Sequence, residues 1–199
     1  MRPAVFLDRD GTMIHDVGYL RRLDDIRWFP PTIDAIRLLN RAGFLVCVVT
    51  NQSGIGRGLI APDFVPEAHR VMSGALEAGG ARVDGWFYCP HHPHAEVAQY
   101  RAVCECRKPA PGLIHQARAQ FPIDLARSFV IGDKPIDVGL GVAVGARGIL
   151  VRTGYGEEAV EAHGGAVPGA AFVAADLMEA TSWLLGASGH PRQDGQECI

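Results

Sequence analysis

Short apolar runs alternate along this chain with stretches of helical periodicity, and polar residues follow most of the apolar runs. Five runs are typical of buried strands, at residues 4–7, 45–50, 86–89, 129–131 and 148–151. Between and after them, helices are expected at residues 32–42, 63–78, 111–120, 135–144 and 176–185. Within residues 32–42, for example, Ala35, Leu39 and Ala42 recur at the spacing of one helix face. This order predicts an α/β fold whose parallel sheet is buried under helices on both faces.

The chain has 199 residues, which is enough for one domain with a substantial core. We expect a single Rossmann-like domain over residues 1–185. Residues 186–199 are polar and rich in turn formers, so we expect a disordered tail there. The segments 16–28 and 54–62, which follow the first two strands, are too short to form a large cap domain over the sheet.

The charge pattern argues against some classes of partner. The net charge is -3 and no long run of Lys and Arg is visible, so a nucleic-acid-binding surface is not expected. No apolar run approaches the roughly 20 residues that span a bilayer, and the apolar stretch at the N-terminus is too short for a signal peptide. The sequence therefore predicts a cytoplasmic protein with neither nucleic-acid nor membrane partners, and we expect a monomer.

Carboxylates gather where predicted strands end. Asp8 and Asp10 follow the first strand, Thr50 and Asn51 follow the second, and Asp133 follows the fourth. The carboxyl ends of adjacent parallel strands form the ligand-binding edge of such a sheet. Crowded carboxylates repel one another, so a cluster of them favours a bound cation, and a small set of oxygen ligands suits Mg²⁺. Each Asp alone could instead cap a helix or close a turn, which would explain one residue but not the set.

The residues at these strand ends resemble the signature motifs of a known family. Residues 8–12 (Asp-Arg-Asp-Gly-Thr), Thr50-Asn51, Lys108 and Gly132-Asp133 occur in the order that characterises phosphatases of the haloacid dehalogenase superfamily. The resemblance implies that Asp8 attacks phosphorus and forms an aspartyl-phosphate. It also implies that Asp10 protonates the leaving alcohol and then deprotonates the attacking water.

The same resemblance assigns roles to the other polar groups. Thr50 would bind the phosphoryl oxygens, and Lys108 would neutralise their charge. Asp137, one helical turn beyond the fourth motif, would orient Lys108 or a metal-bound water. The Mg²⁺ ligands would be Asp8, the main-chain carbonyl of Asp10, and Asp133.

A second cluster lies in the loop that follows the third strand. Three thiols and one imidazole make a complete tetrahedral ligand set for Zn²⁺, from Cys89, His91, Cys104 and Cys106. Such a closed site is structural, and it would stiffen the loop that carries the phosphate-binding lysine. His92 and His94 compete with His91 for the ligand position, and the thiols could instead be unrelated core residues.

Within the superfamily, the chain resembles the subfamily of D-glycero-D-manno-heptose 1,7-bisphosphate 7-phosphatases. The matching stretches are residues 18–19, 50–58, 89–93 and 104–109. The resemblance implies a small phosphorylated sugar as substrate, with contacts from Asp16, Val17, Gly18, Tyr19, Thr50, Asn51, Gln52, Ser53, Arg107, Lys108 and Lys134. Arg107 would hold the second phosphate with two hydrogen bonds, although an Arg in a loop can equally be a solvated surface charge.

Two other functions stay open. Histidinol-phosphate phosphatases share the fold and a similar zinc loop, but they typically carry an acidic residue where this chain has Ser53. A catalytically inactive, zinc-stabilised binding module is the other alternative, and it would have no need of Asp10 two residues from Asp8. The predicted helix at residues 63–78 matches no substrate-binding pattern of the subfamily.

Overall fold

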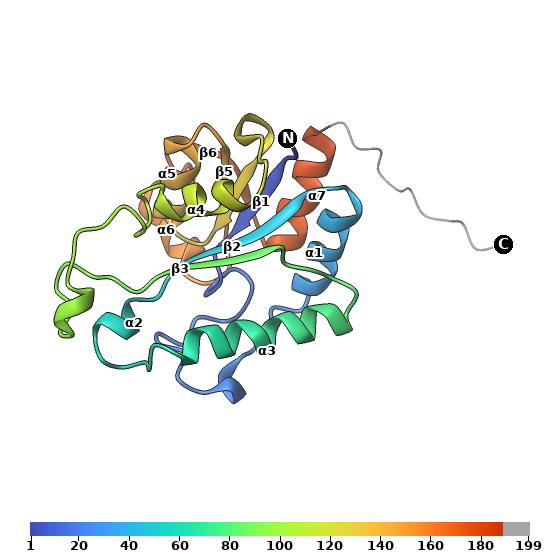
Figure 1. Cartoon of the computed structure of the whole chain (residues 1–199). Helices are drawn as coiled ribbons and strands as arrows, with labels where there is room; N and C mark the ends of the chain where they lie inside the picture. Colours follow the sequence, from blue (N-terminus) through green and yellow to red (C-terminus); the bar gives the residue numbers. More distant parts are fainter. Residues whose placement is uncertain (189–199) are drawn as a thin grey trace.

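Six strands form a parallel sheet in the computed structural model, which describes residues 1–188 (Figure 1). Their order across the sheet is β3-β2-β1-β4-β5-β6. The strands are β1 (Ala4–Leu7), β2 (Leu45–Asn51), β3 (Gly85–Cys89), β4 (Phe129–Gly132), β5 (Arg147–Val151) and β6 (Ala170–Ala174). The predicted α/β, Rossmann-like class is therefore confirmed.

The middle of the sheet is apolar on both sides, as the uninterrupted apolar runs of the sequence indicate. All four residues of β1 are buried. Phe6 of β1 pairs with Cys47 of β2 on one side and with Val130 of β4 on the other. Buried Val, Ile and Phe side chains fit the pleated surface well, so these short runs form strands without further local signals.

Helices cover both faces of the sheet (Figure 1). On one face lie α1 (Thr32–Arg41), α3 (Phe64–Ala78) and α7 (Leu177–Ala187), which share one buried apolar cluster with the strands. On the other face lie α4 (Gly112–Gln120) and α5 (Pro135–Ala143), while α6 (Gly156–Ala162) packs beside β5. The result is a three-layer domain in which every long helix buries one apolar face.

The sequence did not predict β6, α6, the one-turn helix α2 (Ser53–Gly56) or the short 3-10 helices Leu23–Asp25, Ala98–Tyr100 and Leu125–Arg127. β6 is an edge strand of mostly small, half-buried residues, so it has no strong apolar run. α6 is only seven residues long and carries no long periodic pattern. Helix α7 ends at Ala187, two residues inside the segment that we expected to be a tail, and the predicted disorder of residues 189–199 lies outside the described residues.

The strand order places the functional edge between β1 and β4. The chain runs outward from β1 to β2 and β3, and then returns to the other side of β1 with β4. Ligands of open α/β sheets bind at such a reversal, at the carboxyl ends of the strands. Only the short 3-10 helix Leu23–Asp25 lies between β1 and α1, and only the one-turn helix α2 lies between β2 and α3, so no cap domain covers this edge within residues 1–188. None of the helices in that range combines the length and apolar character that crossing a membrane requires.

Candidate active site

Asp8 lies at the carboxyl end of β1, where its main-chain N–H donates to Ile131 of β4 at 2.9 Å. The chain then turns sharply through Gly11, which has a φ of 86°. Only glycine adopts this conformation freely, and a Cβ at this position would also overlap the carboxylate of Asp133. Gly11 therefore allows the turn after β1 and the end of β4 to approach each other closely.

Lys108 forms the centre of a buried charge cluster. Its Nζ lies 2.8 Å from Oδ1 of Asp8 and 2.6 Å from Oδ1 of Asp137, and the lysine is 3% exposed. Burial by itself would lower the pKa of Lys108, but the carboxylates of Asp137 and Asp8 outweigh it and raise this pKa above its ordinary value. The side chain is therefore a permanent cation beside the predicted nucleophile.

Asn51 holds the loop that presents this lysine. Its Oδ1 accepts from the main-chain N–H of Lys108 at 3.0 Å, and its Nδ2 donates to the main-chain carbonyl of the same residue at 3.3 Å. The amide thus fixes one peptide segment from both sides. A substrate contact was predicted for Asn51 from the sequence, and the described structure adds this link between β2 and the lysine loop.

Asp133 is fully buried at the end of β4. Its Oδ2 accepts from the main-chain N–H of Tyr155 at 2.9 Å, whereas its Oδ1 has no hydrogen-bond partner. Burial, followed by the nearby charge of Asp8, raises the pKa of Asp133 to about 7. A buried oxygen without a partner costs free energy, which a cation would recover.

Asp137 sits at the start of α5, one turn beyond Asp133. Its Oδ2 accepts from the main-chain N–H of Lys134 at 3.1 Å and so caps the helix. Gly132 leaves room for this carboxylate, because a Cβ on that glycine would overlap it. Burial raises the pKa of Asp137, and the charge of Lys108 opposes that rise.

The carboxylates fit a divalent metal ion. One oxygen each from Asp8, Asp133 and Asp137 lies within 4.8 Å of the others. Hard oxygen ligands of this kind suit Mg²⁺, and the unpartnered Oδ1 of Asp133 is a ready ligand atom. Asp137 already pairs with Lys108, so of the two roles that the resemblance implied for it, the geometry favours orienting that lysine over orienting a metal-bound water. The carboxylate of Asp10 lies outside this group.

Asp10 is instead held in a hydrogen-bonded network beside the cluster. Gln52 donates from Nε2 to Oδ2 of Asp10 at 2.9 Å and to Oγ1 of Thr50 at 2.8 Å. Arg9 donates to both carboxylate oxygens of Asp10. No role was predicted for Arg9 from the sequence, although its position between Asp8 and Asp10 was an available signal.

A cavity of about 450 Å³ opens above these groups. Its walls include every predicted catalytic and substrate-binding residue except Val17, which is exposed. The predicted residues in its lining are Asp8, Asp10, Asp16, Gly18, Tyr19, Thr50, Asn51, Gln52, Ser53, Arg107, Lys108 and Lys134. The strand-end motifs thus converge on one hollow, as the topology requires.

Tyr155 also lines this cavity, although it was not among the site residues predicted from the sequence. It follows β5, so the same strand-end rule could have found it, but no recognised motif marks it. Nζ of Lys134 lies 4.4 Å from the centre of the Tyr155 ring and 3.3 Å from Oδ2 of Asp16. These contacts hold the lysine at the cavity wall.

The second predicted cluster also assembles. Cys89 Sγ lies 3.5 Å from Cys104 Sγ and 3.1 Å from Cys106 Sγ, and Nδ1 of His91 lies 3.3 Å from Cys106 Sγ. All four ligand atoms fall within 4.8 Å of one another. The thiols are too far apart for a disulfide and close enough to share one metal ion, so the chemistry of the donors fits Zn²⁺. His92 contacts Arg57 instead, which favours His91 as the fourth ligand.

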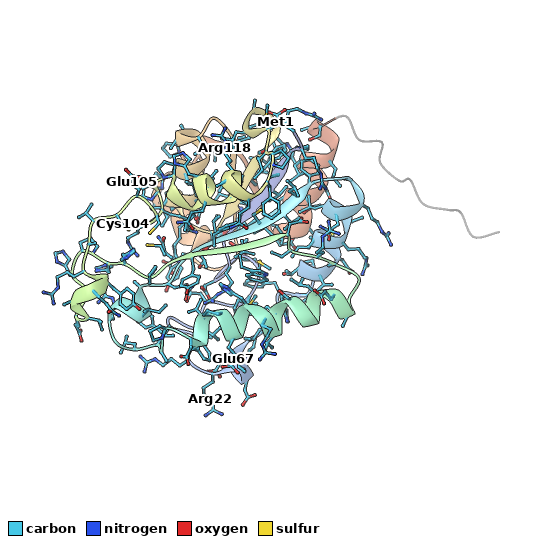
Figure 2. All side chains as sticks on the ribbon, viewed as in Figure 1. Met1, Arg22, Glu67, Cys104, Glu105 and Arg118 are labelled. Carbon is cyan, nitrogen blue, oxygen red and sulfur yellow. The ribbon has the colours of Figure 1, made fainter. Side chains whose placement is uncertain are left out.

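This thiol cluster adjoins the lysine loop. Cys104, labelled in Figure 2, lies on the segment between β3 and α4, and Lys108 follows Cys106 by two residues. Arg107 donates from Nη1 to the main-chain carbonyl of His91 at 3.3 Å. The two ends of the loop therefore contact each other at the thiol cluster, and Asn51 links the loop to β2 by hydrogen bonds.

Comparison with known proteins identifies relatives over most of the chain. Residues 105–180 match the family model described as HAD-hydrolase-like. The D-glycero-beta-D-manno-heptose-1,7-bisphosphate 7-phosphatase of Rhodopseudomonas palustris is 45% identical over 147 residues, which cover 74% of this chain and 82% of the relative. The protein of the same name from Escherichia coli K12 is 45% identical over 154 residues, which cover 76% of this chain and 80% of the relative.

Solved structures resemble the whole domain. The D,D-heptose 1,7-bisphosphate phosphatase from B. bronchiseptica, complexed with magnesium and phosphate, has a TM-score of 0.81 and 33% identity, and covers 94% of this chain and 99% of its own. The enzyme of the same name from Burkholderia thailandensis has a TM-score of 0.69 and 32% identity, and covers 92% and 99%. The likeness therefore extends over the sheet and its helices as well as over the sequence.

Proposed function

This chain belongs to the family of haloacid dehalogenase-like hydrolases that contains the D-glycero-beta-D-manno-heptose-1,7-bisphosphate 7-phosphatases, and we propose that it removes the 7-phosphate of that sugar bisphosphate. The observation that carries the proposal is the Asp8–Lys108 pair at the floor of a cavity whose wall also holds Arg107, which pairs with no carboxylate within residues 1–188. Lys134, the other cation of the wall, already pairs with Asp16. A guanidinium without a carboxylate partner beside a phosphoryl site suits a second phosphate on the same substrate.

The first half-reaction transfers the phosphoryl group to the protein. An oxygen of Asp8 attacks phosphorus while the bond from phosphorus to the sugar oxygen breaks, and an aspartyl-phosphate forms. Asp10 gives its proton to the leaving oxygen, which departs as an alcohol. Lys108, 2.8 Å from Asp8, offsets the negative charge that nucleophile and phosphoryl group bring together. Thr50 donates its hydroxyl hydrogen to a phosphoryl oxygen.

The second half-reaction releases phosphate. Water attacks phosphorus, Asp10 takes a proton from that water, and the bond between phosphorus and Asp8 breaks. The products are inorganic phosphate and the free carboxylate of Asp8, with Asp10 protonated again for the next turnover. One residue can serve as acid and then as base because each half-reaction leaves it in the state that the next one needs.

Mg²⁺ is the metal that we propose for the carboxylate cluster. When bound, it would supply positive charge that offsets the repulsion between the carboxylate nucleophile and the anionic phosphate. Its proposed ligands are Asp8, Asp133 and the main-chain carbonyl of Asp10. Asp137, which pairs with Lys108, would then act by holding that lysine rather than by binding the metal.

Arg107 is the proposed contact for the phosphate that stays on the sugar. It lines the cavity, the only hydrogen bond of its guanidinium within residues 1–188 is to a main-chain carbonyl, and no carboxylate in that range pairs with it. A guanidinium in this state can bind a phosphate with two parallel hydrogen bonds. Histidinol phosphate, the alternative substrate, offers a cationic ammonium instead of a second phosphate, so Arg107 disfavours it.

A substrate pair tests this assignment. We expect kcat/KM of the wild-type enzyme to be highest for the heptose 1,7-bisphosphate, lower for the matching 7-monophosphate, and lowest for histidinol phosphate. Arg107→Met should reduce kcat/KM for the bisphosphate by about 10-fold or more, in line with the loss of a charge-assisted hydrogen bond, and should leave the monophosphate nearly unchanged. An equal reduction for both sugars, or a preference for histidinol phosphate, would reject the proposed substrate.

The sulfur cluster is proposed to hold a structural Zn²⁺. Its ligands would be Cys89, His91, Cys104 and Cys106, which fill all four positions and leave none open for chemistry. Because Lys108 follows Cys106 by two residues, the metal would act on catalysis only through the position of that loop.

A further inference from the structure

We propose that Arg9 is a positioning residue that holds the carboxylate of Asp10 for proton transfer, and that His69 of α3 anchors Arg9 from the opposite side. The inference rests on the proposed function only in that Asp10 is taken as the general acid. The proposal assigns a role to α3, which supplies His69 and whose sequence matched no substrate-binding pattern.

Arg9 is almost completely buried, at 1% exposure, and each of its three guanidinium nitrogens lies within 3.4 Å of a polar partner. Nε lies 3.2 Å from Oδ1 and 3.1 Å from Oδ2 of Asp10, and one terminal nitrogen, Nη2, lies 2.9 Å from Oδ1. A planar guanidinium that meets both oxygens of a carboxylate fixes its orientation as well as its position. Burying an arginine is costly unless its donors are satisfied, so this arrangement is specific rather than incidental.

The rest of the guanidinium is used as well. Nη2 also donates to Oε1 of Gln52 at 3.1 Å, and Gln52 in turn donates to Oδ2 of Asp10 at 2.9 Å. The carboxylate is thus held by two neighbours that also hold each other. Reactions that depend on proton transfer need the donor within hydrogen-bond reach of the leaving oxygen, and errors of about 1 Å can cost 10²-fold in rate.

His69 completes the arrangement from α3. Its Nε2 lies 3.4 Å from Nη1 of Arg9, and its ring stacks on Trp86 of β3 with a centroid separation of 4.5 Å. Tyr88 meets the ring edge-on at 5.9 Å. The residue is 5% exposed, and burial, with the charge of Arg9 adding to it, lowers the pKa of His69 to about 3. The imidazole is therefore neutral at physiological pH and can accept a hydrogen bond from the guanidinium.

Two substrates with different leaving groups can distinguish a positioning role of Arg9 from a purely structural one. A sugar alkoxide is a poor leaving group and needs the proton that Asp10 supplies. The phenolate of p-nitrophenyl phosphate leaves without a proton. The parameter kcat/KM covers the steps up to the formation of the aspartyl-phosphate, so it reports the step in which the leaving group departs.

The experiment compares kcat/KM on the heptose bisphosphate and on p-nitrophenyl phosphate for the wild type, Arg9→Met, Arg9→Lys and His69→Gln. For Arg9→Met we expect a loss of about 10²-fold on the sugar phosphate, the size expected for a misplaced catalytic group, and a much smaller loss on p-nitrophenyl phosphate. Arg9→Lys retains the positive charge but not the planar guanidinium that binds both carboxylate oxygens. Its loss of kcat/KM on the sugar phosphate should lie between those of the wild type and Arg9→Met. His69→Gln should show a weaker form of the same selectivity.

Arg37→Met is the matched control. Arg37 also pairs with a carboxylate and a main-chain carbonyl, those of Asp34 and Gly79, but these lie away from the cavity. This variant should show the same small change on both substrates. Equal losses on the two substrates in the folded Arg9 variants would overturn the inference. If Arg9→Met does not fold, the comparison of Arg9→Lys and His69→Gln with the wild type decides it by the same criterion.

Failure of the proposed substrate gives a different result. If the wild type leaves the heptose bisphosphate intact but cleaves another alkyl phosphate, the substrate assignment is wrong, and that alkyl phosphate replaces the sugar in the comparison. A wild type that cleaves no alkyl phosphate would overturn the inference together with the acid role of Asp10.

Discussion

Nζ of Lys108 lies 2.6 Å from Oδ1 of Asp137, and both side chains are buried beside Asp8, the proposed nucleophile. The pair is more than a local contact, because Asp137 begins α5 after β4 whereas Lys108 comes from the loop after β3. Strand β4 is the neighbour of β1, and the ion pair therefore joins the carboxylate-rich edge of the sheet to the loop that follows β3. Such a buried pair is expensive to break from one side.

Asp137→Asn tests this link. The amide keeps the shape of the carboxylate but not its charge, so Lys108 retains only Asp8 as an anionic partner. We expect the free energy of unfolding to fall by at least about 1 kcal/mol, the range for a weakened buried charged hydrogen bond, and kcat to fall more than KM changes. Urea unfolding and steady-state kinetics measure both. Asp34→Asn, which weakens a more exposed pair with Arg37, should change stability by less than about 1 kcal/mol, and an equal effect of the two variants would contradict the prediction.

Substitution of Asp8 should reduce turnover more severely than substitution of Asp10, the second aspartate of the first motif. Asp8→Asn removes the nucleophile, and we expect no turnover from a protein that still folds. Asp10→Asn keeps the nucleophile but cannot supply a proton, and we expect a loss of about 10²–10⁴-fold on the sugar phosphate. Circular dichroism checks the fold of both variants. Normal turnover in the Asp8 variant would exclude the aspartyl-phosphate mechanism.

Metal analysis of the purified protein should find about one zinc per chain. Cys106→Ser should release most of it and lower the melting temperature, because a structural site contributes its binding free energy to folding. Cys47→Ala is a matched control, since Cys47 is a buried thiol in β2 outside the cluster. Zinc content should stay unchanged in that variant. Protein that is free of zinc while its thiols are reduced would reject the site.

The buried histidine of α3 predicts a pH dependence of stability. Burial lowers the pKa of His69 to about 3, below its ordinary value of 6.5, so between these values the unfolded chain binds a proton that the folded chain does not. The contribution of His69 is thus fully present above pH 6.5 and is lost as the pH falls toward 3. The slope approaches about 1.4 kcal/mol per pH unit.

Urea unfolding between pH 7 and pH 4.5 measures this slope. His69→Gln should reduce the slope of the unfolding free energy against pH by the contribution of one titrating proton. His115→Gln, at an exposed position of α4, should leave the slope unchanged. Identical slopes in the wild type and His69→Gln would show that His69 is not kept neutral by the fold.

The sequence alone determined the class of fold and most of the candidate site. Each of the five strands that it predicted begins and ends within two residues of its observed bounds, since a buried parallel strand must be an uninterrupted apolar run. The residues after those runs, such as Asp8, Thr50 and Asp133, could be grouped because the carboxyl ends of parallel strands share one edge. The three thiols of the cluster were equally visible, because their residue types and spacing suit only a few purposes, whereas the geometry that favours His91 over His92 and His94 came from the tertiary structure.

Tertiary structure decided what each polar group touches. Asn51 binds the main chain 57 residues away, and Arg9 reaches His69 across 60 residues, and neither contact follows from a local pattern. The edge strand β6 and the short helix α6 form because the neighbouring elements bury them, although their own sequences carry weak signals. Local periodicity reports which face of a segment is apolar. It does not report which of several buried donors and acceptors will meet, because that depends on how the packed layers bring distant segments together.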